Sequence, residues 1–174
     1  ATLPTDTGED SLYMVVKRTI DSTTKRYIEK LKLFDFGSDT TGAFFVDSGL
    51  TYDGSATTSI TGLNHLEGVE VEILADGAAH ANKTVTDGAI TLDRSASKVH
   101  VGYGYTSTLE TLRMEAGAED GIAQGKIKRI HGVTARFFQT VGAELGPDTS
   151  NLDRLPFRDS SMAMDEAVPL FTGD

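Results

Sequence analysis

The chain has 174 residues, of which 39% are hydrophobic, and it contains no cysteine. Acidic side chains outnumber basic ones 26 to 16, which gives a formal net charge of −10. Without cysteine the chain cannot form disulfides, zinc–thiolate sites or a cysteine nucleophile. No apolar run approaches the roughly 20 residues that a membrane-spanning helix needs. The negative charge disfavours binding to a phosphate backbone, because like charges repel.

Threonine is abundant, with 22 residues, and tryptophan is absent. A β-branched side chain suits the pleated surface of a sheet, so this composition favours β structure. The first residues, ATLPTDTGED, lack the basic and apolar segments that are typical of a secretory signal peptide. The last residues, VPLFTGD, predict that the sequence stops within a longer protein.

Residues 1–46 are predicted to contribute a β-hairpin to an outer β domain. A continuous apolar strand is expected over residues 12–19, and an alternating strand over residues 25–33. Asp21 and Ser22 supply the turn between them. Because a lone hairpin cannot bury its apolar face, this one needs a further layer of structure to cover it.

Residues 47–106 are predicted to form a complete small β module. Apolar residues alternate with charged or polar ones in VEVEIL and again in SKVHV, which is the pattern of half-buried strands. Asp87 and Gly88, between TVT and AITL, indicate a two-residue hairpin, because its turn needs positive φ at both positions. We expect a small β-barrel. Its predicted core consists of Val69, Val71, Ile73, Val85, Ile90, Leu92, Val99 and Val101.

Residues 107–174 are predicted to return to the outer β domain and to be truncated at the C-terminus. We expect a long strand over residues 127–143, a short one over 151–157, and irregular structure from residue 162 onward. The predicted fold class is therefore mainly β, with the barrel-like module inserted between strands of a second antiparallel β layer. In that layer the early hairpin and the strand near 129–141 should share one sheet.

The search for catalytic or metal-binding residues yields no constellation. None of the four histidines has the i, i+4 spacing of a helical zinc site, and we expect each to face solvent or cap an element. The four are His65, His80, His100 and His131. For His100, the alternation of its strand predicts a place on the polar, exposed face.

Glycine-rich and acidic segments also have simpler interpretations. Lys126 follows a glycine-rich stretch, but Ile127 stands where a phosphate-binding loop needs Ser or Thr, so this stretch is predicted to be a connector. The carboxylates of Glu70 and Glu72 match the solvent face of a strand, and the pair at 119–120 lies in the same connector. We therefore predict no catalytic, cofactor-binding or metal-binding residue, and no enzymatic activity.

Three segments of the middle module, VEVEILADG, TVTDGAITL and SKVHVGYGYTSTLETL, resemble a tail protein found in short-tailed phages and prophages. The middle module of that protein is similar to the small β-barrel insert of ubiquitin-activating enzymes, the first catalytic cysteine half-domain. Three flanking segments are similar to the tail protein as well. They are SLYMVVKRTIDSTTKRYIEKL, GIAQGKIKRIHGVTARFFQTVGAELG and PFRDSSMAMDEAVPLFTGD. The resemblance covers roughly residues 11–174.

The resemblance implies a non-catalytic structural protein of the tail nozzle or tail tube, which forms part of the DNA-ejection conduit. The family implies a ring-like homo-oligomer that contacts other tail proteins, lets DNA pass without specific binding and has no membrane span. It also implies a place in the virion tail after assembly in the bacterial host cytoplasm. The likeness to ubiquitin-activating enzymes carries no chemistry, because the insert does not bear the thiol.

An alternative is a glycan-binding or adhesin-like β module of a phage or bacterial surface protein. Exposed aromatic rings would then serve as platforms for sugars, and Tyr103 and Tyr105 are the candidates. Exposure separates the two hypotheses, because a sugar platform requires open rings whereas a core would bury both tyrosines. An enzyme is the third and weakest hypothesis, for want of a catalytic constellation.

Overall fold

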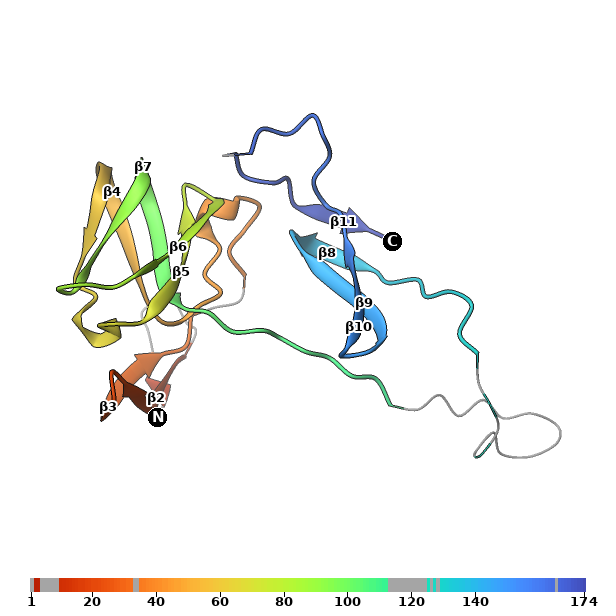
Figure 1. Ribbon diagram of the computed structural model, residues 1–174, viewed down its shortest axis with the longest axis horizontal. Coiled ribbons are helices and arrows are strands. Elements are labelled where there is room, and N and C mark those ends of the chain that lie inside the picture. The colour runs from red at the N-terminus through yellow and green to blue at the C-terminus, as the bar shows by residue number, and fades with distance from the viewer. Residues whose placement is uncertain are drawn as a thin grey trace.

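A computed structural model of the chain describes residues 2–3, 10–32, 35–112, 125, 127, 129–164 and 166–174. The described part is built from antiparallel sheets of four, three, two and two strands, with only short 3₁₀ segments besides. This confirms the predicted mainly β fold class. The four-stranded sheet and the hairpin lie together at one end of the molecule, and the two small C-terminal sheets lie apart from them (Figure 1).

The middle module is an open, twisted sheet with the strand order β4-β7-β5-β6. Its strands are β4 (Asp47–Thr61), β5 (Glu70–Ala75), β6 (Ala78–Thr84) and β7 (Ala89–Tyr103). Strand β7 pairs with β4 along most of its length and with β5 near its end. The edge strands β4 and β6 do not pair with each other, so the predicted barrel is wrong. Four strands are fewer than even the small five-stranded barrels use.

A short 3₁₀ turn covers the interior that the open sheet would otherwise leave exposed. The turn η2 (Asn64–Leu66) follows β4, and the side chains of Leu63 and Leu66 are fully buried beneath the sheet. They join the core that the alternation predicts, in which Val69 is the single member only partly buried. The remaining predicted core residues, Val71, Ile73, Val85, Ile90, Leu92, Val99 and Val101, are all buried.

Two-residue turns with positive φ at both positions connect the hairpins. Asp87 and Gly88 have φ of 53° and 67°, which confirms the predicted turn, and Asp21 and Ser22 have φ of 47° and 59°. The carboxylate of Glu67 accepts hydrogen bonds from the backbone N–H groups of Asp87 and Gly88, at 2.9 and 2.7 Å. This carboxylate ties the β6–β7 connection to the loop after β4.

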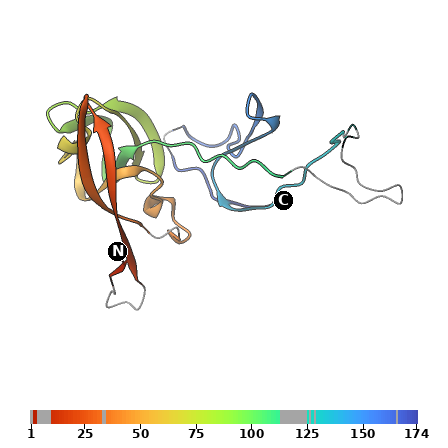
Figure 2. The ribbon, with the colours of Figure 1, turned by 90° about the horizontal axis from the view of Figure 1, so that it is seen from below.

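The early hairpin forms its own sheet with the strand order β1-β2-β3. Its strands are β1 (Thr2–Leu3), β2 (Ser11–Ile20) and β3 (Thr23–Lys30). They match the predicted hairpin, but the expectation that they share a sheet with the strand near 129–141 is wrong. The hairpin lies against the module instead (Figure 2), and the side chain of Ile20 packs on the module's core. The module thus supplies the layer that the hairpin needs.

Four short strands in two sheets make up the C-terminal part. They are β8 (Phe137–Thr140), β9 (Ala143–Asp148), β10 (Asn151–Leu155) and β11 (Phe171–Gly173), paired as β8 with β11 and β9 with β10. Strand β10 confirms the short strand predicted over 151–157. The long strand predicted over 127–143 is reduced to β8 and the start of β9. Its residues 129–136 form no strand.

Candidate functional site

A charged cluster anchors the hairpin to the first strand of the module. The Arg18 guanidinium donates two hydrogen bonds of 3.0 Å to the two carboxylate oxygens of Glu29. Glu29 also accepts a hydrogen bond of 2.5 Å from the Ser48 hydroxyl, and Asp47 lies 3.5 Å from the same guanidinium. The hydrogen bonds from Arg18 are the main cause that lowers the pKa of Glu29 below its ordinary value. The cluster therefore stays charged at neutral pH and links β2, β3 and β4.

A second contact reinforces the attachment of the hairpin. The Tyr27 ring meets the imidazole of His65 edge-on, with ring centroids 6.4 Å apart. His65 in turn makes a 2.7 Å hydrogen bond through Nε2 to the carbonyl oxygen of Ser48. His65 was expected to face solvent or cap an element, and it is half-buried at the junction between hairpin and module. Its role in the described structure is to join the two.

Residues 39–46, which we call the strap, cross the second face of the module's sheet. They begin with the 3₁₀ turn η1 (Thr40–Gly42), whose N-terminus is capped by the carboxylate of Asp39. Glycines in the strands beneath make room for the strap. A Cβ atom at Gly102 would lie 2.7 Å from Val46 Cγ2 and 2.8 Å from the carbonyl oxygen of Asp47. A Cβ at Gly49 would lie 2.6 Å from the Phe44 ring, so neither position has space for a side chain.

The strap buries His100, which corrects the prediction that this residue faces solvent. His100 is only 2% exposed, and its ring meets the Phe44 ring edge-on at 5.4 Å. Its Nε2 lies 2.8 Å from the carbonyl oxygen of Thr41, and its Nδ1 lies 2.8 Å from the Thr51 hydroxyl. A carbonyl oxygen can only accept, so Nε2 donates to Thr41 and Nδ1 accepts from Thr51 in the neutral imidazole. Burial lowers the pKa of His100, which favours this neutral form.

The other two histidines have structural or exposed positions. The His80 side chain accepts a 2.9 Å hydrogen bond through Nε2 from the backbone N–H of Asp93, and it is largely buried. His131 is exposed. Among the residues that the structure describes, no group of three or more His, Asp or Glu side chains could hold a metal ion. Lys126 and the carboxylate pair at 119–120 lie outside the described residues.

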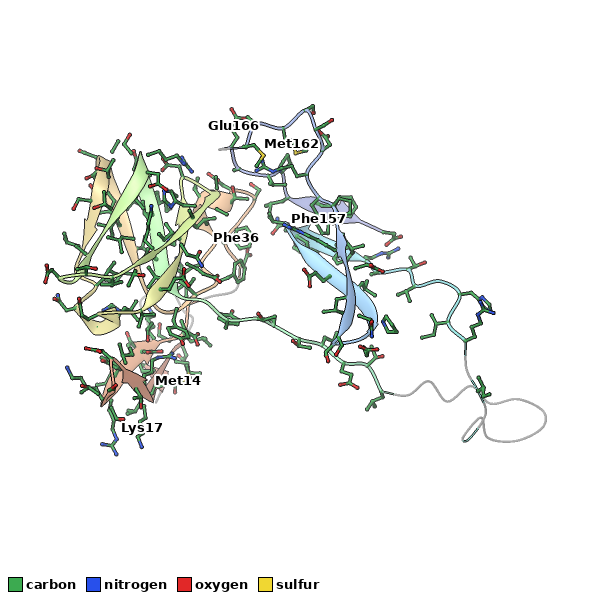
Figure 3. The ribbon with its side chains drawn as sticks, in the orientation of Figure 1. Met14, Lys17, Phe36, Phe157, Met162 and Glu166 are labelled. Carbon is green, nitrogen blue, oxygen red and sulfur yellow. The ribbon has the colours of Figure 1, made fainter. Side chains whose placement is uncertain are left out.

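A large cleft lies between the module and the C-terminal sheets. This cleft has a volume of about 1410 Å³ and is lined mainly by apolar side chains. Phe36 lines it from the segment before the strap, and Phe157 lines it from the C-terminal part (Figure 3). Phe157 also packs edge-on against Phe137, at 5.5 Å between ring centroids. The lining also includes four carboxylate residues, Asp35, Glu72, Asp159 and Glu166.

The two tyrosines proposed as sugar platforms are both open to solvent. Tyr103, at the end of β7, is 46% exposed, and Tyr105 is 51% exposed. They do not belong to a core, so the structure leaves the glycan-binding alternative available. The exposed carboxylates of Glu70 and Glu72 lie on β5, as their alternation predicts.

Comparisons with known proteins identify no family for the chain: no protein-family model and no curated protein matches it. Among the residues that the structure describes, no helix has the length and apolar character required to cross a membrane. Proposals about function therefore rest on the sequence patterns and on the surfaces described above.

Proposed function

We propose that the chain is a non-catalytic structural component of a phage tail, of the nozzle or tail-tube adaptor type. Its copies would form a ring that contributes to the DNA-ejection conduit, in a virion assembled in the bacterial host cytoplasm. The resemblance of the module and its flanks to tail proteins of short-tailed phages motivates this proposal. The exposure of apolar side chains outside the module supports the proposal independently.

Large apolar side chains are exposed on the small sheets. Val15 and Ile28 in the hairpin are 70% and 78% exposed, and Phe138 in β8 is 74% exposed. Val15 and Ile28 are direct cross-strand neighbours, and contiguous exposed apolar surface of this kind is typical of interaction sites. A subunit of a larger assembly leaves them exposed only until its neighbours cover them. Incomplete burial of this kind is what the proposed structural role requires.

The distribution of charge is also consistent with a conduit. Residues 47–106 carry 8 acidic and 3 basic side chains, and residues 144–174 carry 7 acidic and 2 basic ones. A wall with this balance does not grip a phosphate backbone, because it has few cations with which to displace the counterions of DNA. The isolated chain should therefore not retard duplex DNA near physiological salt. Salt-dependent retardation would contradict a passive role.

The decisive experiment is to determine where the protein is found and how it assembles. We expect antibody labelling of purified particles to place it at the tail, and electron microscopy of the assembled full-length protein to show a closed ring. The tail labelling is the direct test of the proposed role. A protein that is absent from particles and remains monomeric when full-length would refute that role.

A glycan-binding module remains the second candidate, because Tyr103 and Tyr105 are both exposed. Its test is binding of the chain to an array of bacterial surface glycans. If the tyrosines form a platform, Tyr103→Ala together with Tyr105→Ala should abolish glycan binding and leave the melting temperature unchanged. As a control, replacement of the half-buried Tyr52 should lower the melting temperature, because that side chain packs on the core.

A further inference from the structure

The outward face of the hairpin is basic and apolar, in a chain whose net charge is strongly negative. Cross-strand pairing places Val15 opposite Ile28 and Lys17 opposite Arg26 on one face of the β2–β3 ladder. We call this the outer face. It contains no carboxylate, and its members are Tyr13, Val15, Lys17, Thr19, Thr24, Arg26, Ile28 and Lys30.

The opposite, inner face of the same hairpin is the one that contacts the module. Alternate residues of the two strands, among them Arg18, Ile20 and Glu29, lie on it and are half-buried. The outer face therefore points away from the module, and Figure 3 shows Lys17 projecting outward from the hairpin. No other described segment pairs with the free edge of β3.

The cations of the outer face have no anionic partner among the described residues. Within the described residues, the ion pairs of the hairpin join Arg18 to Glu29 and to Asp47, on the inner side. Lys17 and Arg26 are direct cross-strand neighbours, and like charges in that position destabilise a ladder. An exposed aliphatic pair lies beside these two cations. Such a surface is expected to bind an anionic, partly apolar partner most favourably.

We propose that the outer face of the hairpin binds the acidic β5 surface of a second copy of this chain. Glu70 and Glu72 are exposed on β5, and within the described residues neither forms an ion pair. They lie two residues apart on one strand, which separates them by roughly 7 Å. The facing pair of Lys17 and Arg26 has Cβ atoms roughly 5 Å apart, so long side chains can match the two spacings.

The chemistry of the outer face also constrains the symmetry of the contact. A two-fold contact centred on the outer face would set cations against cations. The neighbour must therefore present a different, acidic surface, and the contact is heterologous when each pair of subunits makes it once. Heterologous contacts generate rings when the rotation between subunits closes. This inference deepens the proposed function and rests on it for the ring, but the pairing of the two surfaces is tested on the isolated chain.

Duplex DNA is the rival partner for a basic surface, and the composition of the outer face disfavours it. Val15 and Ile28 occupy its centre, and aliphatic side chains gain nothing from a phosphate backbone. The chain itself supplies abundant anionic surface, with 26 acidic side chains. A second copy therefore satisfies the charge of the outer face.

The test is sedimentation velocity of the whole chain at low and high salt, with charge-reversed variants. We expect the wild-type chain to self-associate, and Lys17→Glu with Arg26→Glu to weaken the association about tenfold or more. Arg129→Glu with Arg154→Glu changes the net charge equally outside the hairpin and the module and should leave the association intact. Circular dichroism should be unchanged in each variant, because all four side chains are exposed.

The reciprocal variant makes the test specific to the two surfaces. Glu70→Lys with Glu72→Lys should also abolish self-association, and an equimolar mixture with the Lys17→Glu, Arg26→Glu variant should restore it. A wild-type chain that stays monomeric at low salt, or a mixture that fails to associate, would overturn the inference. So would binding of a DNA duplex that depends on Lys17 and Arg26. None of these results decides whether the protein resides in a tail, which particle labelling tests separately.

Discussion

The middle module and the C-terminal sheets are built from similar strands, but only the module buries its apolar residues. Every buried residue among those described lies between Ile60 and Gly102. In the C-terminal part the best-packed group is a cluster of three half-buried or exposed rings, Phe137, Phe157 and Phe171. Four strands with a 3₁₀ turn beneath them enclose a core, whereas isolated pairs of strands cannot. We therefore expect the module to fold by itself, and the small sheets to depend on what covers them.

The largest effect should come from placing a charge in the module's core. Val101 is 1% exposed, so Val101→Asp loses about 1.5–3 kcal/mol of side-chain burial and adds the cost of an unpaired buried carboxylate. We expect loss of the cooperative unfolding transition, measured by circular dichroism. Val15→Asp is the matched control on the hairpin, where the side chain is 70% exposed, and its effect should stay within about 0.5 kcal/mol. If both substitutions lowered the stability equally, the module's core and the hairpin's surface would not differ in packing.

A smaller effect should come from crowding the strap. Gly102→Ala would set its Cβ 2.7 Å from Val46 Cγ2 in the strap and 2.8 Å from the carbonyl oxygen of Asp47, where β4 begins. Overpacking of this kind costs about 1–3 kcal/mol. Gly142, between β8 and β9, has no atom within 4 Å of such a Cβ, so Gly142→Ala should be close to neutral. Urea denaturation of both variants measures the difference, and an unaffected Gly102→Ala variant would mean that the strap is not seated on the sheet.

The local pattern predicts the module's strands well, because apolar and polar residues alternate along a half-buried strand. It predicts the turns for a similar reason, since Asp-Gly at positive φ is a local preference. The pattern does not predict which strands pair when they are far apart in the sequence. The prediction of one sheet shared by the hairpin and the strand near 129–141 was therefore wrong. The pattern also missed His100, because alternation cannot tell whether a second face will be covered. Gly49 and Gly102 within the strands were the available signal, since glycines there mark a close approach of backbone.

The burial of His100 predicts a pH dependence that is confined to the module. Burial lowers the pKa of this imidazole, so the unfolded chain binds its proton more readily than the folded chain does. Stability should therefore be full above the ordinary histidine pKa of 6.5 and should decline as the pH falls below that value. Thermal melts between neutral pH and the carboxylate range measure the decline.

Two histidine variants separate this effect from that of other groups. His100→Gln should flatten the pH profile, and it should cost about 1–3 kcal/mol at neutral pH if either hydrogen bond is lost. His131 is exposed, and His131→Gln should reproduce the wild-type profile. A pH profile that survives His100→Gln would assign the dependence to a different group.

The smallest effect should appear where the hairpin meets the module. Arg18 and Glu29 are each about one-fifth exposed, at 20% and 19%, and a partly solvated pair contributes about 1 kcal/mol. Arg18→Met should therefore lower the stability by about that amount and raise hydrogen exchange in β2 and β3, while β5 and β7 stay protected. Lys17→Met removes a cation from the outer face of the same strand and should leave exchange unchanged in the monomer. If Arg18→Met exposes the module's strands equally, the hairpin and the module form one cooperative unit. The boundary between well-packed and dependent parts would then lie after β7 instead of before β4.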